Sequence, residues 1–216
     1  MAWQACLEET WAACLCGCNP IGAVVVNAAG ELQTRGRNHI NDADAPPGQV
    51  SANQLAHAEL NALLAMRQKP QDVHSYAIYT AVEPCPLCMG AIYMSGVRAI
   101  YYACRDDYAG ATNLLGKSWY LSHKPVKVFG PQAGALEDAV FALQMAYQLQ
   151  ERSPEDHVIV RQRAQIERGA RLGEQLAAQG AVQAWQAAGW DAPTVFNHLF
   201  SADAATGLAD KSFSFK

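Results

Sequence analysis

The chain has 216 residues, half of them hydrophobic, and a formal net charge of −4. This length suits one domain with an appendage, or two small domains, and the composition is sufficient for a buried core. The mild charge, with no lysine among the first 66 residues, provides no electrostatic footprint for nucleic acid. No apolar stretch approaches the ~20 residues that a membrane-spanning helix needs.

Helices and strands are expected to alternate along the first 150 residues. The expected helices cover residues 3–15, 56–67, 85–95 and 135–150. The expected strands cover residues 21–27, 31–37, 75–82, 98–104 and 125–129. Such alternation is typical of an α/β fold in which helices cover a mixed sheet.

The character of the sequence changes after Ser153-Pro154. Beyond it there is no cysteine and no convincing pair of strands, and the pattern predicts helices to about residue 189 and irregular structure after that. We therefore divide the chain into a domain over 1–152 and a mostly helical C-terminal extension over 153–216, whose role the sequence leaves open. Six aromatic residues of the extension need burial, so we expect it to dock onto the first domain. These are Trp185, Trp190, Phe196, Phe200, Phe213 and Phe215.

Seven cysteines are spread along the chain, and its first residues lack the basic and apolar segments of a signal peptide. We therefore expect a cytoplasmic protein, in which a reducing environment keeps the cysteines as thiols or thiolates. Cys14, Cys16 and Cys18 have no nearby histidine or second cysteine pair. Buried free thiols are the preferred interpretation of these three, rather than a second metal site.

Three potential metal ligands and one carboxylate stand in two short motifs. His57 and Glu59 lie near the start of one expected helix, and Cys85 and Cys88 open the next. One imidazole and two sulfurs suit zinc, and cysteines three residues apart lie on the same helical face. Three protein ligands leave a fourth position open for water, as in catalytic zinc sites. Glu59 is then expected to be the proton carrier beside that water.

The pattern His-x-Glu followed by Pro-Cys-x-x-Cys is a known signature of zinc deaminases. Around it, residues 19–26, 36–38, 56–59 and 80–93 resemble the cytidine deaminase-like superfamily. They resemble most the branch that holds bacterial guanine deaminases and tRNA adenosine deaminases. The resemblance extends over about the first 150 residues. It implies a three-layer helix–sheet–helix fold with a central five-stranded sheet, and a zinc-dependent hydrolase that releases ammonia from an aminated ring.

The candidate substrate contacts come partly from this resemblance and partly from position in the fold. The resemblance implies that Asn38 hydrogen-bonds the base and that the backbone at Ala58 and Pro84 holds it. Asp106 and Asp107 follow a strand end, where α/β folds gather ligands. One of these two carboxylates is a candidate reader of a polar ring edge, and capping the following helix is the alternative.

The preferred substrate is a small free base, guanine or a related aminopurine, because residues 80–93 are most similar to guanine deaminases. A tRNA adenosine, cytosine and a triazine are the alternatives. Cys104-Arg105-Asp106 resembles an element of tRNA adenosine deaminases, so Arg105 is a candidate phosphate contact. A different class of function is a non-catalytic zinc-stabilised binding protein. Glu59 distinguishes the two classes, because a purely structural zinc site has no need of it.

Relatives in this superfamily are usually dimeric, so the resemblance also implies a homodimer. The expected helix after Cys88 carries Met89, Ile92, Tyr93 and Met94, which is more apolar surface than one sheet face needs. We therefore expect this helix to contribute to the interface between two copies.

Overall fold

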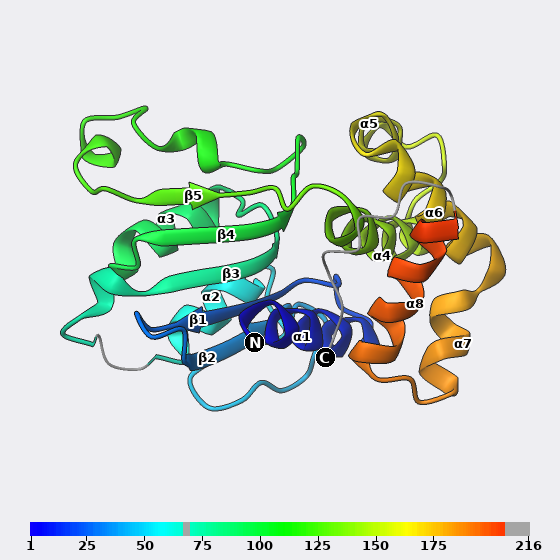
Figure 1. Cartoon of the computed structure of the whole chain (residues 1–216), viewed down its shortest axis with the longest axis horizontal. Helices are drawn as coiled ribbons and strands as arrows, with labels where there is room; N and C mark the ends of the chain where they lie inside the picture. The colour runs from blue at the N-terminus through cyan, green and yellow to red at the C-terminus, as the bar shows by residue number, and fades with distance from the viewer. Residues whose placement is uncertain (67–69, 206–216) are drawn as a thin grey trace.

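A five-stranded mixed sheet runs through the first part of the chain (Figure 1). The computed structural model describes residues 1–66 and 70–205, with side chains to residue 201. The strands are β1 (Gly22–Val26), β2 (Leu32–Arg37), β3 (Ala77–Val82), β4 (Ala99–Cys104) and β5 (Lys127–Phe129). Their order is β2-β1-β3-β4-β5, with β1 antiparallel to both neighbours and β3, β4 and β5 parallel. The five strands lie where the sequence predicts them.

Helices cover both faces of this sheet, which makes the three-layer α/β fold that the sequence predicts. The helices of the two layers are α1 (Ala2–Leu15) with α4 (Ala135–Glu151), and α2 (Ala58–Leu64) with α3 (Pro86–Ser95). Successive side chains of a strand point to opposite faces. Accordingly, Val24 packs with α1 and α4, whereas Ala23 and Val25 pack with α2 and α3. Three short 3-10 helices lie in the connections, at Val73–Ser75, Thr112–Leu114 and Tyr120–Ser122.

In the part of the chain that the structure describes, four helices follow α4, and they lie beyond one end of the sheet (Figure 1). They are α5 (His157–Gln165), α6 (Glu167–Gln179), α7 (Ala181–Ala187) and α8 (Ala192–Ala205). Helices α6 and α8 pack against α4, and α8 also contacts α1. Among the described residues, no helix has the length and apolar character that crossing a membrane requires.

The prediction of irregular structure after residue 189 is wrong, because α8 occupies residues 192–205. Val195, Phe196 and Leu199 are fully buried there, and their spacing puts them on one side of a helix. Asp191 precedes the helix and accepts a hydrogen bond from the backbone N–H of Thr194 at 2.9 Å, as an N-terminal cap does. The short apolar face and the cap stabilise α8 because α1 and α4 cover this face.

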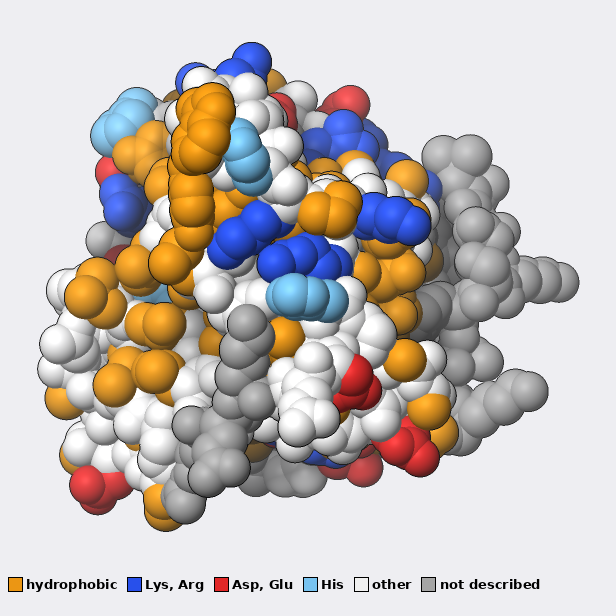
Figure 2. Space-filling model, turned by 90° about the vertical axis from the view of Figure 1, so that its left-hand side faces the viewer, with side chains coloured by type: hydrophobic (Ala, Val, Ile, Leu, Met, Phe, Trp, Pro, Cys, Tyr) orange, Lys and Arg blue, Asp and Glu red, His pale blue; other side chains and the backbone are white. Residues whose placement is uncertain are grey.

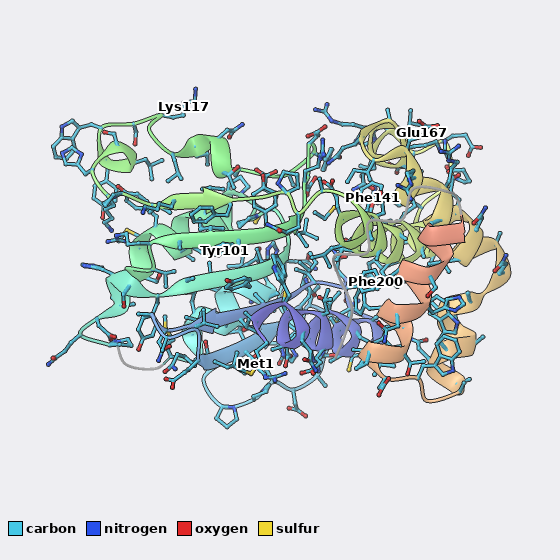
Figure 3. The ribbon with its side chains drawn as sticks, in the orientation of Figure 1. Met1, Tyr101, Lys117, Phe141, Glu167 and Phe200 are labelled. Atoms are coloured by element: carbon cyan, nitrogen blue, oxygen red, sulfur yellow. The ribbon has the colours of Figure 1, made fainter. Side chains whose placement is uncertain are left out.

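The C-terminal helices share one hydrophobic core with α1 and α4. Figure 3 shows Phe141 on α4, between the sheet and the C-terminal helices. The indole N–H of Trp11 on α1 donates to the backbone carbonyl of Trp190 at 2.7 Å, and Trp190 stacks on Trp185. The expected docking of the extension is therefore present. Phe213 and Phe215 lie outside the described residues, and the boundary at residue 152 stays a prediction.

Candidate active site

Helix α2 brings His57 and Glu59 to the end of the sheet. His57 is the N-cap of this helix, and the helix rests closely on β2 at Gly36. A Cβ atom at Gly36 would lie 2.2 Å from the backbone nitrogen of Ala62, so only glycine allows this approach. Thr34 on β2 adds a hydrogen bond from its hydroxyl to the Ala62 carbonyl at 2.7 Å. The start of α2 is thereby held at a defined position against the sheet.

Helix α3 brings the two cysteines to the same place. Cys85 is the N-cap and Pro86 the first residue of the helix, where proline is favoured. The Nδ1 atom of His57 and the two sulfurs all lie within 4.8 Å of one another. His57 Nδ1 lies 3.5 Å from the sulfur of Cys85 and 3.5 Å from that of Cys88.

This arrangement fits a zinc ion. Zn–S bonds of ~2.3 Å and Zn–N bonds of ~2.0 Å at a tetrahedral angle separate sulfur from nitrogen by about 3.5 Å, which matches both distances above. The His57 ring also hydrogen-bonds the backbone of Gln54, the kind of contact that orients a metal-binding imidazole. A hydrogen bond from Cys88 lowers the pKa of the Cys85 thiol to about 4, so Cys85 is a ready thiolate. Three ligands again leave a fourth position open.

Glu59 is buried beside these ligands. Its Oε2 atom accepts a hydrogen bond from the Cys88 thiol at 3.2 Å. Burial raises the pKa of the Glu59 carboxyl, because removal from water disfavours the charged form. A carboxyl with a raised pKa is a stronger base than an ordinary one, which suits a residue that accepts a proton and passes it on.

A cavity of about 530 Å³ lies between the end of the sheet and helices α4 and α5, and its wall includes neither Glu59 nor a metal ligand. Asn38 and Asp106 contribute to its wall, as do Gln54, which hydrogen-bonds His57, and Val82 at the end of β3. A volume of this size suits a small-molecule ligand. Gln54 is the contact that links the wall of the cavity to the metal group.

Residues 2–104 match the family model of the cytidine and deoxycytidylate deaminase zinc-binding region. This part of the chain therefore carries the zinc-binding region of that deaminase family. The deaminases of this family are hydrolases that typically use zinc. In this chain His57, Cys85 and Cys88 form a group that is placed to hold such a metal ion.

The individual relatives of this chain carry different names, two of them guanine deaminases. A guanine deaminase of Bacillus subtilis is 34% identical over 95 residues, which are 43% of this chain and 53% of that protein. A tRNA(Ile)-lysidine synthase of Deinococcus radiodurans is 32% identical over 121 residues, which are 53% of this chain and 19% of that protein. The solved guanine deaminase of Nitrosomonas europaea has a TM-score of 0.52 at 25% identity, covering 67% of this chain and 81% of that one. The matches therefore span about half of one curated relative and about a fifth of the other.

Two of the five expected substrate contacts lie in the wall of the cavity. Asn38 and Asp106 are in its wall. Ala58 and Pro84 adjoin metal ligands in the chain, with Ala58 as the first residue of α2. Asp107 is exposed and lies outside the wall. These positions favour Asp106 over Asp107 as a contact.

The alternative role of Asp106, capping of the following helix, is wrong, because the next helix is the 3-10 helix Thr112–Leu114, which begins after Ala111 and has no side-chain cap. Asp106 stabilises the turn that it begins. Its Oδ1 atom accepts hydrogen bonds from the backbone N–H groups of Tyr108 and Ala109, both at 3.0 Å. Glu83 accepts a hydrogen bond from the Asp106 N–H at 3.3 Å and one from the Thr112 N–H at 3.2 Å. Glu83 therefore fixes the loop that carries Asp106.

Cys14, Cys16 and Cys18 lie outside the metal group. None of the seven cysteines forms a disulfide, and Cys14 and Cys18 are buried as expected. Cys16 is exposed, so the expectation of burial is wrong for this one. It lies just after the C-terminus of α1, where the chain turns toward solvent.

Sequence reasoning missed the glutamines on the far wall of the cavity. Gln144 and Gln148 come from α4, and Gln162 comes from α5. Gln144 and Gln148 are one helical turn apart, beside the apolar residues Val140 and Leu143. Polar residues next to the apolar stripe of a helix were the available signal.

Proposed function

We propose that the protein is a zinc-dependent hydrolase that deaminates a nucleobase, most favourably free guanine or a related aminopurine. The observation that carries this proposal is the buried Glu59 carboxyl, 3.2 Å from the Cys88 sulfur of a three-ligand group. A structural zinc site uses four protein ligands and needs no such carboxyl. Zinc at this position would supply a nucleophile at neutral pH by lowering the pKa of water.

The chain's own residues would then handle the proton and the ring. Glu59 accepts a proton as water adds to the ring carbon that bears the amino group, and passes it to the neighbouring ring nitrogen. Glu59 then carries the proton of the added hydroxyl to the amino group. The bond between this group and the ring carbon breaks, ammonia leaves, and a carbonyl remains on the ring. Because Glu59 is buried, bulk water does not compete for this proton.

The substrate contacts follow from the groups that remain available. The Asn38 side-chain oxygen already accepts from the Ile40 N–H at 3.1 Å, which leaves its NH₂ group to donate to a ring acceptor. The Ala58 N–H begins a helix and has no intrahelical acceptor. The Pro84 carbonyl accepts from Ala111 at 2.9 Å and has a second lone pair. Asp106 likewise has a second carboxylate oxygen for a ring N–H.

A tRNA substrate is less well supported, because Arg105 is engaged within the chain. Its Nε atom donates to Glu137 Oε1 at 2.7 Å, and its Nη2 atom donates to Glu137 Oε2 at 3.1 Å. This two-point pairing is the geometry with which arginine binds carboxylate or phosphate. A phosphate contact by Arg105 would require breaking it, so the pairing favours a free base over tRNA adenosine.

Ammonia release tests the proposal directly. We expect zinc-loaded protein to release ammonia from guanine, and to form no inosine in an anticodon stem-loop that carries a target adenosine. A tRNA-acting enzyme gains affinity from phosphate contacts and weakens steeply as salt is added. Inosine formation with that salt dependence, and no ammonia from guanine, would contradict a free-base substrate.

We further propose that the protein is a homodimer, through a surface that keeps only part of the one that the sequence indicates. Met89, Ile92 and Tyr93 are buried within their own chain, so of the four apolar residues that the sequence indicates only Met94 is exposed. The sulfur of Met94 accepts a hydrogen bond from the hydroxyl of the exposed Tyr120 at 3.3 Å. Trp119, the residue before Tyr120, is 77% exposed. Figure 2 shows hydrophobic and basic side chains gathered on this side of the molecule. Large exposed apolar groups of this kind mark association surfaces.

Light scattering at micromolar concentration is expected to give the mass of two chains. Trp119→Glu should shift that mass toward one chain, because a buried unpaired charge is costly. Tyr108→Glu, an exposed aromatic position on the loop after β4, is the control and should leave the mass unchanged. A wild-type monomer would contradict the dimer.

A further inference from the structure

A second pocket lies at the end of the sheet opposite to the metal group. Its volume is about 490 Å³, and its wall comes from the segment before β3, the start of β4 and the start of β5. The metal-binding cysteines follow the other end of β3. Because β3 and β4 have six residues each, about 20 Å separates the two ends of the sheet. This pocket is therefore distinct from the deaminase site.

The wall of this pocket is rich in basic side chains. Within the described part of the chain, it contains no aspartate or glutamate. Asp72, whose side chain hydrogen-bonds that of Tyr76, lies outside the wall. The sequence shows the same segregation of charge, since Asp106 and Asp107 are the only acidic residues between positions 85 and 136, and they follow the other end of β4. The basic residues of the wall are His74, Arg98, His123, Lys124 and Lys127.

The three permanent cations of this wall have no carboxylate partner among the described residues. Arginines elsewhere form ion pairs, as Arg105 does with Glu137, but none of the ion pairs in the described chain involves Arg98, Lys124 or Lys127. Figure 2 shows basic side chains gathered on this side of the molecule. In a chain whose net charge is −4, three unpaired cations around one concave place attract an anion there.

Two of these cations are held in position by the chain itself. Lys124 Nζ donates to the Tyr93 carbonyl at 2.9 Å and lies 4.5 Å from the centre of the Tyr93 ring. Arg98 Nη1 donates to the Val97 carbonyl at 3.1 Å, and the backbone N–H of Lys127 donates to the Arg98 carbonyl at 2.8 Å. Lysine has three N–H donors and arginine five, so both side chains keep donors for a ligand. Donors that are already fixed lose little conformational freedom on binding.

We propose that this pocket binds the diphosphate or triphosphate group of a small molecule. Phosphate oxygens accept charge-assisted hydrogen bonds from lysine and arginine N–H groups. One phosphate group carries about two negative charges at most, so linked phosphates match the three cations of the wall better than a single one. The volume of about 490 Å³ suits a small molecule, whereas a nucleic acid strand needs a longer track of cations along its backbone.

The site is separate from the surfaces assigned above. Glu59 and the metal ligands do not line it, and neither do Met94, Trp119 and Tyr120, which mark the proposed dimer surface. Removing a cation of the pocket should therefore leave ammonia release from guanine unchanged.

Isothermal titration of the zinc-loaded full-length protein with inorganic pyrophosphate, at physiological ionic strength, tests the proposal. Metal analysis after the titration checks that zinc stays in the protein. Lys127→Gln should weaken pyrophosphate binding about tenfold, because it removes a charge-assisted hydrogen bond from an exposed position that the fold does not need.

Lys117→Gln is the matched control. Lys117 is an exposed lysine of the connection between β4 and β5 and lies outside the wall, and Figure 3 shows it at the outer edge of that connection. The substitution changes the net charge by the same amount as Lys127→Gln. It should change the dissociation constant of pyrophosphate by less than about twofold, because salt screens charges that do not contact the ligand.

Two further ligands identify the source of the phosphates. Inorganic orthophosphate should bind at least about tenfold more weakly than pyrophosphate, because it reaches fewer of the cations. Adenosine triphosphate that binds more tightly than pyrophosphate, and weakens with Lys127→Gln, would assign the site to a nucleoside triphosphate. The reverse order, with the same sensitivity to Lys127→Gln, would assign it to an inorganic polyphosphate.

Several results would overturn the proposal. They are no binding of pyrophosphate, binding that Lys127→Gln leaves unchanged, equal effects of Lys127→Gln and Lys117→Gln, and orthophosphate that binds as tightly as pyrophosphate. A single-stranded RNA without terminal phosphates that binds more tightly than pyrophosphate, and weakens with Lys127→Gln, would assign this surface to nucleic acid instead. Because each measurement is of binding, these outcomes do not depend on whether the protein deaminates guanine.

Discussion

Glu59→Gln is expected to lower turnover by about 10²–10⁴-fold, the usual contribution of a positioned proton carrier, while about one zinc per chain is retained. The amide of glutamine has the shape of the carboxyl but cannot take a proton from water and pass it on. The substitution leaves His57, Cys85 and Cys88, the group placed for the metal, unchanged. Metal analysis and steady-state ammonia release on the same preparation measure the two quantities.

Cys88→Ala serves as the comparison, because it removes one of the three ligands. It should lose both zinc and activity, whereas Glu59→Gln should lose activity alone. The contrast assigns the effect of Glu59 to proton transfer rather than to metal binding. A Glu59→Gln protein with normal turnover would contradict the mechanism, and one that had lost its zinc would show that Glu59 supports the metal group instead.

Phe196→Ala is expected to lower the free energy of unfolding by about 3–5 kcal/mol, the usual cost of truncating a buried phenylalanine. Phe196 on α8 is 0% exposed and belongs to the core that joins α8 to α1 and α4. The effect should appear in the global unfolding transition, because that core also includes Val24 of the sheet. Denaturant unfolding followed by circular dichroism measures it.

Phe129→Ala is the matched control. Phe129 on β5 is 41% exposed and stacks on Tyr101 at 4.6 Å between ring centres. Its loss should cost no more than about 1.5 kcal/mol, the contribution of one aromatic pair. Equal effects of the two substitutions, or a separate early transition in Phe196→Ala protein, would show that the C-terminal helices unfold independently of the sheet.

The metal group could be predicted from sequence because its information is local. His57 stands at a helix start, and Cys85 and Cys88 are separated by the three residues that place two side chains on one helical face. The strands were equally accessible, since Val24 and its neighbours form a short apolar run between turn signals. One imidazole and two sulfurs suit zinc, and the known signature of zinc deaminases indicated the metal before any tertiary contact was known.

The cavity was decided by tertiary structure, since its walls meet across long separations in the chain. Asn38 and Gln162 line the same cavity although they are far apart in the sequence, and no local sequence pattern relates them. The same holds for Arg105. The resemblance of Cys104-Arg105-Asp106 to an element of tRNA adenosine deaminases suggested a phosphate contact, and it gave no sign of the two hydrogen bonds from Arg105 to Glu137. Helix α8 needed α1 and α4 to bury its apolar side, because packing supplies most of the stability of a helix this short. Sequence alone determined the group placed for the metal, and the packing of α4 and α5 against the sheet decided which residues line the cavity.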